Sequence, residues 1–574
     1  MVDIGAPVNI ESFYKFTDDV SNPELFESWK PKIKAYLEDL DKESPAQYKI
    51  PEKEVPEDLD EKSFSTIEYL KDTMYLTDSD KKITEMSVVD LAKNITSRKL
   101  SSVEVMNSFA HRAIILNQFT NFASQFFIKE AMNTAKLLDE YINNTGNVIG
   151  PLHGIPISVK EQIGMAGKIT HGGWVAWLDY IPEEDATTIK VLKKLGAVLY
   201  VRTNEPQTLM HLDSNNNIIG RTRNPYNSLL SSGGSSGGEG ACVGGRGSAI
   251  GVGSDIGGSI RAPAAFCGCF GLRPSTRRIS TAGGVSSGRG QESVVAVEGP
   301  LAHTAKDIDY FMKSYINAGK PWEDDPWCMP MPWREVAKPE PRDVTVAIMY
   351  DNGMVKPHAP ISRGLKTVEG KLKSSGVKVI KFEPLMIEEA YDVCHQLYTC
   401  DGNNAQKEML KPSGEPLLPL TKWAMSMGNG DKCLSITENR SLNARRDTIR
   451  AAYNKYFIEK KVDFVISPTY VGVAPCAIEN GIAGPYYWGY TSLWNLLDLP
   501  TLVAPTGLYQ YPPSDLKDPS YKPRSPIDEI EQNKYIPELF RDAPICLQIT
   551  GRRYFDEEVV SFGELFEEIM KNKS

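Results

Sequence analysis

The residues best suited to chemistry lie in the stretch 231–259, which holds twelve glycines and several serines. Glycine loses more conformational entropy on folding than any other residue, so this density needs a geometric reason, such as positive φ angles or backbone brought against a ligand. A flexible linker is one explanation. However, Ala, Val, Ile and Cys interrupt the glycines, and the largely apolar segment 260–266 follows, which is not typical of linkers. We therefore expect a folded site.

Two short motifs offer other interpretations of the same stretch. A nucleotide site needs Gly-Lys-Ser/Thr at the end of its loop or a G-x-G-x-x-G pattern, and neither is present. Residues 233–237 fit G-x-S-x-G, the nucleophile elbow of α/β-hydrolases, which requires a later histidine and an acid. The later histidines, His303, His358 and His395, have no suggestive neighbours. Both interpretations are weak.

A longer match extends over roughly 150–275. Residues 233–274 resemble the amidase signature, and the upstream segment 152–161 is similar to the strand that carries the lysine of that family. Residues 203–207 resemble the segment between the two. The length of the match makes it far more specific than either short motif. Within the family, the chain looks closest to fungal acetamidase-like enzymes and, around 206–207, to the fatty acid amide hydrolases.

The resemblance implies an amide hydrolase with a Ser–cis-Ser–Lys relay. The nucleophile of the family falls on Ser259, the bridging serine after a cis peptide on Ser235, and the base on Lys160. An amide is a poor electrophile with a poor leaving group, so the enzyme must strengthen a hydroxyl and later protonate the nitrogen. A buried lysine can do both if it starts uncharged. Lowering its pKa from about 10.4 to about 7.5 costs roughly 4 kcal/mol.

The glycines beside the nucleophile suit an oxyanion hole. The backbone N–H groups of Ile256, Gly257, Gly258 and Ser259 can turn inward, and one such donor is worth about 3–4 kcal/mol in the transition state. A helix that begins near Ser259 would add a favourable dipole.

Other residues receive supporting roles. Ser236 is expected either to hold the relay or to satisfy backbone groups. Asp255 and Arg261 are expected to support the loop by an ion pair or by backbone hydrogen bonds. Ser235 is also assigned to substrate binding, together with Leu209, which stands where the fatty acid amide hydrolases place an acyl-site residue.

Alternating strands and helices must position these groups. Residues 155–160 and 197–202 read as strands, and 186–195 as the helix that precedes the second of them. Further elements are expected over 344–350, 362–374, 377–381, 462–467, 502–504 and 557–571. The alternation predicts an α/β fold with a large mixed, mostly parallel sheet covered by helices on both faces. We expect a helical N-terminal extension over 1–84 and the catalytic domain over 85–574.

Bulk properties limit the partners. The net charge of −10, spread along the chain, argues against nucleic acid, and no apolar run is long enough to span a membrane. Nine scattered cysteines favour a reducing compartment, hence the cytoplasm. Cys267 and Cys269 lack a second ligand pair, so we expect no metal and no cofactor. A homodimer is possible on this evidence.

The expected substrate is a small-molecule amide, and the acetamidase resemblance favours a small aliphatic one. Two alternatives stay open: the ammonia-supplying subunit of a glutamine-dependent amidotransferase, and a catalytically silent scaffold with the same fold. The intact Ser259, Ser235 and Lys160 speak against the scaffold.

Overall fold

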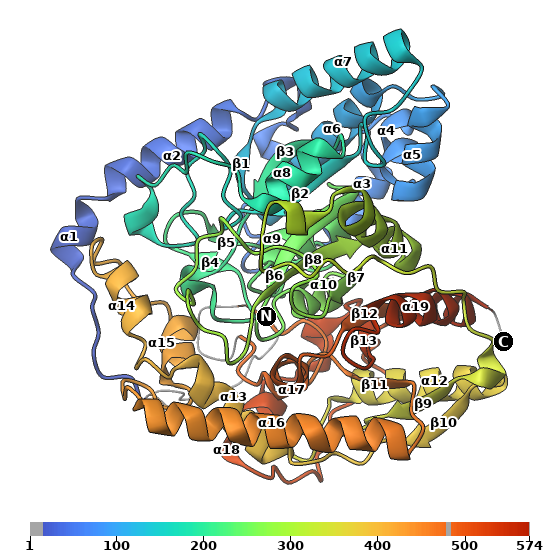
Figure 1. Ribbon diagram of the computed structural model, residues 1–574. Coiled ribbons are helices and arrows are strands. Elements are labelled where there is room, and N and C mark those ends of the chain that lie inside the picture. Colours follow the sequence, from blue (N-terminus) through green and yellow to red (C-terminus); the bar gives the residue numbers. More distant parts are fainter. Residues whose placement is uncertain (1–14, 478–483, 573–574) are drawn as a thin grey trace.

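The computed structural model describes residues 15–477 and 484–572, which are built around one eleven-stranded sheet (Figure 1). Across the sheet the strands are β1 (Ala123–Phe126), β3 (Val198–Thr203), β2 (Pro156–Lys160), β6 (Ile250–Asp255), β8 (Val297–Ala302), β7 (Phe270–Arg273), β12 (Thr501–Tyr509), β13 (Pro544–Thr550), β11 (Phe464–Pro468), β9 (Thr345–Ile348) and β10 (Lys378–Lys381). A separate two-stranded pair consists of β4 (Asn215–Asn216) and β5 (Gly220–Arg221). Every residue of β2, β3 and β6 is buried, which explains their nearly continuous apolar sequence.

The α/β fold with a large mixed sheet is confirmed. Parallel pairing occurs in two runs, β3–β2–β6 and β11–β9–β10. The other six neighbouring pairs are antiparallel, namely β1 with β3 and all the pairs between β6 and β11. In a parallel run the carboxyl ends of the strands meet at one edge, where α/β proteins place their ligands. This arrangement brings Lys160, the last residue of β2, next to the end of β6.

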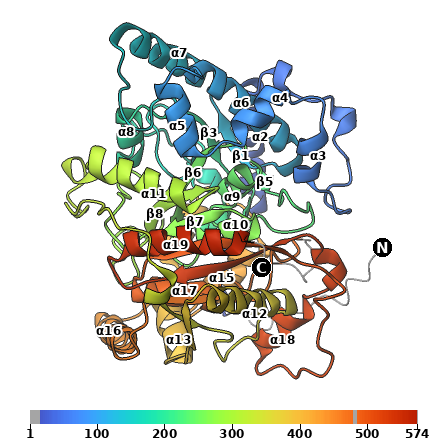
Figure 2. The same cartoon turned by 90° about the vertical axis from the view of Figure 1, so that its right-hand side faces the viewer.

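Helices cover both faces of the sheet. Leu502 and Val503 are consecutive in β12, so their side chains point to opposite faces. Leu502 packs closely on Gly563 of α19 (Asp556–Lys571), whereas Val503 is the partner of Gly271, which faces Ala264 of α10 (Arg261–Phe266). The face of α19 also carries α11 (Ala305–Lys313) and α12 (Ala359–Ser374), as Figure 2 shows. The face of α10 also carries α9 (Gly237–Gly244).

The C-terminal half adds a second layer of helices beyond the face of α10. In this layer α17 (Gly489–Leu497) packs against α13 (Ile387–Tyr398) and α16 (Ile436–Glu459). This half also contains α14 (Asn404–Leu410), α15 (Pro419–Ser426) and α18 (Pro526–Asn533).

The described N-terminal part of the chain is rich in helices. Its helices are α1 (Pro23–Glu27), α2 (Lys30–Lys42), α3 (Thr66–Asp72), α4 (Asp78–Thr84), α5 (Val88–Thr96), α6 (Ser102–Thr120), α7 (Ile128–Thr145) and α8 (Thr187–Lys194). Pro31 lies in the first turn of α2, where its missing N–H has no intrahelical partner to lose. Leu70 and Ile83 share the main core, and the division at residue 84 remains a prediction.

Within the described ranges, no helix combines the length and the apolar composition that crossing a bilayer requires.

Candidate active site

Lys160 is fully buried at the end of β2 and contacts two hydroxyl groups. Its Nζ donates to Ser235 Oγ at 2.6 Å and to Ser254 Oγ at 3.0 Å. Burial lowers the pKa of Lys160 to about 8, although nearby acidic groups raise it. Burial also raises the pKa of Glu239 and Glu298 to about 8, so these neighbours are largely uncharged at neutral pH. The charges of Glu205 and Asp255 act on Lys160 more strongly than these two, but no carboxylate of the described residues lies within ion-pair distance of Lys160 Nζ.

Ser235 stands at the turn that leads into α9. The Gly234–Ser235 peptide bond is cis, as the resemblance implies. The two preceding glycines are required by close backbone contacts. A Cβ on Gly233, which has φ of +83°, would lie 2.6 Å from Pro263, and a Cβ on Gly234 would lie 2.3 Å from the carbonyl oxygen of Asp213. The glycine pair thus lets this turn sit directly against its neighbours.

Ser259 and Ser235 line the same cavity. The segments of the two serines are joined by a hydrogen bond from Ser236 N–H to the Ser259 carbonyl oxygen, at 3.1 Å. The Ser259 hydroxyl donates to no group in residues 15–477 or 484–572. The structure thus brings both predicted serines and Lys160 to one site.

The loop from Asp255 to Ser259 leaves three of the four predicted oxyanion-hole donors available. Gly258 N–H donates to Asp255 Oδ1 at 2.8 Å, so it points to the buried carboxylate and not to the cavity. The backbone N–H groups of Ile256, Gly257 and Ser259 have no acceptor among the described residues. These three, and not four, are the available donors for an oxyanion.

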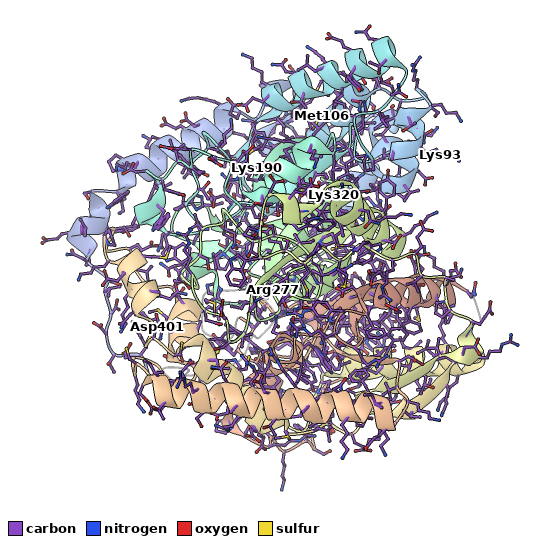
Figure 3. All side chains as sticks on the ribbon, in the orientation of Figure 1. Lys93, Met106, Lys190, Arg277, Lys320 and Asp401 are labelled. Atoms are coloured by element: carbon purple, nitrogen blue, oxygen red, sulfur yellow. The ribbon has the colours of Figure 1, made fainter. Side chains whose placement is uncertain are left out.

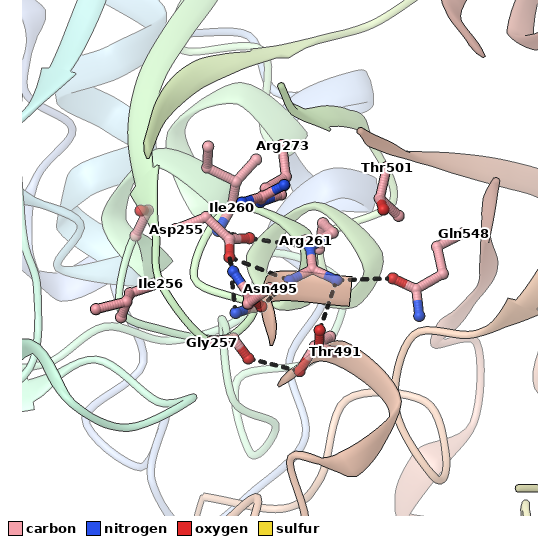
Figure 4. A network of polar contacts seen from close by, with 12 residues as sticks. Asp255, Ile256, Gly257, Ile260, Arg261, Arg273, Thr491, Asn495, Thr501 and Gln548 are labelled. Atoms are coloured by element: carbon pink, nitrogen blue, oxygen red, sulfur yellow. Dashed lines mark hydrogen bonds and ion pairs between the residues drawn. The ribbon is translucent and has the colours of Figure 1, made fainter. Parts of the chain in front are cut away.

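Asp255 and Arg261 form the predicted ion pair, and both are completely buried (Figure 4). Arg261 Nε and Nη2 lie 3.0 and 3.1 Å from the two carboxylate oxygens. Asn495 of α17 donates to the same carboxylate at 2.8 Å, and Arg261 also donates to Gln548 of β13. Burial alone would raise the pKa of Asp255, but chiefly the charge of Arg261 lowers it to about 2. The catalytic loop is therefore held by a charged pair.

Ser254 belongs to the site, although the sequence analysis did not select it. It accepts from Lys160 and donates to Gln162 Oε1 at 2.9 Å. No sequence pattern marks Ser254, because its contact with Lys160 depends on the pairing of β2 with β6. Ser236, by contrast, satisfies backbone groups, because its hydroxyl donates to the Ser254 carbonyl oxygen and accepts from the Ser254 N–H.

The cavity walls beyond the serines combine apolar and polar side chains. Leu209 lines the cavity, as expected from the resemblance, and both Thr208 and Leu209 have left-handed φ angles of 67° and 60°. Asp401, labelled in Figure 3, lies between α13 and α14 and lines the same cavity. The apolar lining consists of Leu209, Met210, Ile256, Ala296, Tyr398, Ala405, Ala424, Met425, Met427 and Trp488.

A second cluster of buried titratable residues lies outside the relay. The ligand atoms of Glu161, His171 and Glu205 lie within 4.8 Å of one another. However, both Glu161 oxygens accept backbone N–H groups at 2.8 Å, and His171 Nδ1 accepts another at 2.9 Å. Arg202 also lies 3.7 Å from Glu161, so the Glu161 carboxylate and His171 Nδ1 are already engaged within the protein.

The nucleophile-elbow interpretation lacks its histidine. The hydroxyl of Ser235 is bonded to Lys160, and the described residues that line the cavity include no histidine. His358 is bonded instead to the Glu531 carbonyl oxygen and His395 to that of Tyr391.

The chain is similar to several known proteins. A family model described as "Amidase" matches residues 104–560. The "Acetamidase" of Emericella nidulans is 37% identical over 520 residues, which cover 88% of this chain and 93% of that protein. The "Acetamidase" of Aspergillus oryzae is 36% identical over 529 residues, which cover 89% and 95%. A solved structure titled "Fatty acid amide hydrolase" superposes with a TM-score of 0.95 at 49% identity, over 98% of this chain and 100% of that chain.

The chain therefore belongs to the amidase-signature family. As a member of that family it is an amide hydrolase, which the sequence predicts. The cytoplasmic location and the homodimer remain predictions.

Proposed function

We propose that the chain cleaves a carboxylic amide to an acid and ammonia or an amine through an acyl-enzyme on Ser259. The observation that carries this proposal is the 2.6 Å contact between Lys160 Nζ and Ser235 Oγ, in a cavity that Ser259 also lines. With a pKa of about 8, roughly one Lys160 in ten is uncharged at pH 7 and can accept a proton.

The proton passes from Ser259 to Ser235 while Ser235 gives its own proton to Lys160. Ser259 Oγ attacks the amide carbonyl carbon, and the N–H groups of Ile256, Gly257 and Ser259 stabilise the oxyanion. The proton then returns through Ser235 to the amide nitrogen, the C–N bond breaks, and ammonia or the amine leaves. Water releases the acid by the same relay.

Covalent labelling tests this assignment. A fluorophosphonate should modify Ser259 once per chain, and the Ser259→Ala variant should take up no label. Label at another serine of Ser259→Ala would refute the nucleophile assignment. Intact-mass and peptide mass spectrometry give both results.

We propose a small aliphatic amide as substrate, supported by the two acetamidase relatives. The apolar side chains of Leu209, Met210 and Met425 in the cavity, together with the similarity to the fatty acid amide hydrolase structure, favour longer acyl amides as the second candidate. Ammonia release from acetamide, longer aliphatic amides, benzamide and glutamine separates the two. Preference for glutamine would instead support the amidotransferase subunit, and no activity with an unlabelled Ser259 would support the silent scaffold.

A further inference from the structure

Two hydroxyl groups from the C-terminal half hold the carbonyl oxygens of the loop before Ser259. Tyr398, the last residue of α13, donates its hydroxyl to the Ile256 carbonyl oxygen at 2.6 Å. Thr491 of α17 donates to the Gly257 carbonyl oxygen, also at 2.6 Å, as drawn in Figure 4. Both helices are more than a hundred residues away in the chain, so these contacts depend on the complete fold.

Each contact fixes the direction of one N–H group. In a trans peptide unit, the C=O and the N–H point in opposite directions. The unit held by Thr491 ends in Gly258 N–H, which is bonded to Asp255, so both of its ends are used inside the protein. The unit held by Tyr398 ends in Gly257 N–H, which has no acceptor among the described residues. Only this second unit keeps a free donor.

We propose that Tyr398 is a positioning residue for the reaction: its hydroxyl holds the Ile256–Gly257 peptide so that Gly257 N–H is directed at the substrate carbonyl oxygen. This inference rests on the proposed function, because only a reaction with an oxyanion uses that donor. Glycine at 257 would otherwise let the peptide rotate. A donor that must reorient during the reaction stabilises the transition state less than a fixed one.

The surroundings of Tyr398 allow the hydroxyl to be tested separately from the ring. The ring lines the cavity and packs edge-on against His395, with 5.7 Å between ring centroids. A Cβ on Gly257 would lie 3.3 Å from the Tyr398 hydroxyl and 3.7 Å from Trp488, so the loop rests on these two side chains. Phenylalanine at 398 keeps this packing and removes the bond to Ile256.

The experiment compares Tyr398→Phe with Tyr391→Phe, a matched control two helical turns earlier in α13. The ring of Tyr391 stacks on Tyr487, with 5.3 Å between ring centroids. Among the described residues, the Tyr391 side chain makes no hydrogen bond to the loop before Ser259. We expect Tyr398→Phe to lower kcat about 10- to 100-fold with KM within about two-fold, since loss of a whole donor costs about 100- to 1,000-fold. Binding of a trifluoromethyl ketone, which mimics the tetrahedral state, should weaken by the same factor as kcat/KM. Tyr391→Phe should change each value by less than about two-fold.

Three results would overturn the inference. These are a kcat of Tyr398→Phe within about two-fold of the wild type, a loss carried by KM alone, and an equal loss in Tyr391→Phe. If Tyr398→Phe is less stable, all variants are compared at a temperature at which each is fully folded by circular dichroism. Ser259→Ala in the same series distinguishes the two levels of the argument: an active Ser259→Ala defeats the proposed function, whereas an inactive one beside an unaffected Tyr398→Phe defeats this inference alone.

Discussion

Two buried lysines, Lys160 and Lys534, have opposite surroundings. Lys160 Nζ contacts two serine hydroxyls, whereas Lys534 Nζ lies 2.8 Å from the Glu531 carboxylate and 3.0 Å from the Tyr470 hydroxyl. Burial lowers the pKa of both, to about 8 for Lys160, but the Glu531 charge and hydrogen bond act against this for Lys534. A buried lysine thus either keeps its charge beside a counter-ion or, without one, loses its proton more readily than a lysine in water. Only the second can act as a base.

Asp255 and Arg261 form a second buried pair of opposite charges, which supports the catalytic loop. Its two charges compensate each other in the interior, and the pKa of Asp255 falls to about 2. The loop therefore has a charged support at one side and a relay that depends on an uncharged amine at the other. Removing the Asp255–Arg261 ion pair should therefore lower the stability of the protein, whereas removing the Lys160 amine should lower its activity.

The largest expected effect comes from replacing each lysine by methionine. Lys160→Met should lower kcat/KM by at least about 10⁴-fold, because loss of one member of a catalytic unit removes most of its acceleration. Lys534→Met should keep kcat/KM within about three-fold but lower the free energy of unfolding by about 3–5 kcal/mol, because Glu531 is left buried and unpaired. Steady-state kinetics and urea unfolding measure both variants. Similar losses of activity in the two would break the comparison.

Arg261→Met should destabilise the protein by about 3–5 kcal/mol, because it leaves the Asp255 carboxylate without its buried partner. In the double variant Asp255→Asn, Arg261→Met no charge remains unpaired, so part of this loss should be recovered. Urea unfolding midpoints, combined with the slopes, give the free energies. A single variant within about 1 kcal/mol of the wild type would show that the ion pair does not support the loop.

Ser254→Ala should have the smallest effect. Ser254 accepts a hydrogen bond from Lys160, and an acceptor favours the charged amine, so its removal should lower the apparent pKa of Lys160 by less than about one unit. The maximal kcat should fall by less than about ten-fold, since Lys160 keeps its contact with Ser235. The pH dependence of kcat/KM measures the shift, and an upward shift would contradict this account of the contact.

Much of the fold could be predicted because its strands are short, buried and apolar. Residues 155–160 were expected as a strand, and β2 spans Pro156–Lys160; residues 557–571 were expected as a helix, and α19 begins one residue earlier. Ser235, Ser259 and Lys160 could be selected because their neighbours in sequence match a family pattern. Such a pattern consists of residues that are close together in the sequence, so it can be found without the fold.

Contacts between distant segments could not be predicted in the same way. Ser254 reaches Lys160 only because β2 and β6 pair in parallel with Val159 opposite Val252, and the sequence does not specify this register. Tyr398 and Thr491 reach the loop from helices of the second layer, and nothing in their local sequence marks them. The Gly258 N–H points away from the cavity because it donates to the buried Asp255 carboxylate. The sequence alone therefore could not distinguish it from the three N–H groups that remain available.

The most direct test of the central claim, that Lys160 acts as an uncharged base, is the pH dependence of kcat/KM with chemistry rate-limiting. Protonated Lys160 cannot accept the proton of Ser235, so kcat/KM should rise about ten-fold per unit at low pH and level off above an apparent pKa of about 8. Lys160→Met should lose this dependence along with most of its activity. A wild-type profile that is flat from pH 6 to about 9 would contradict the account.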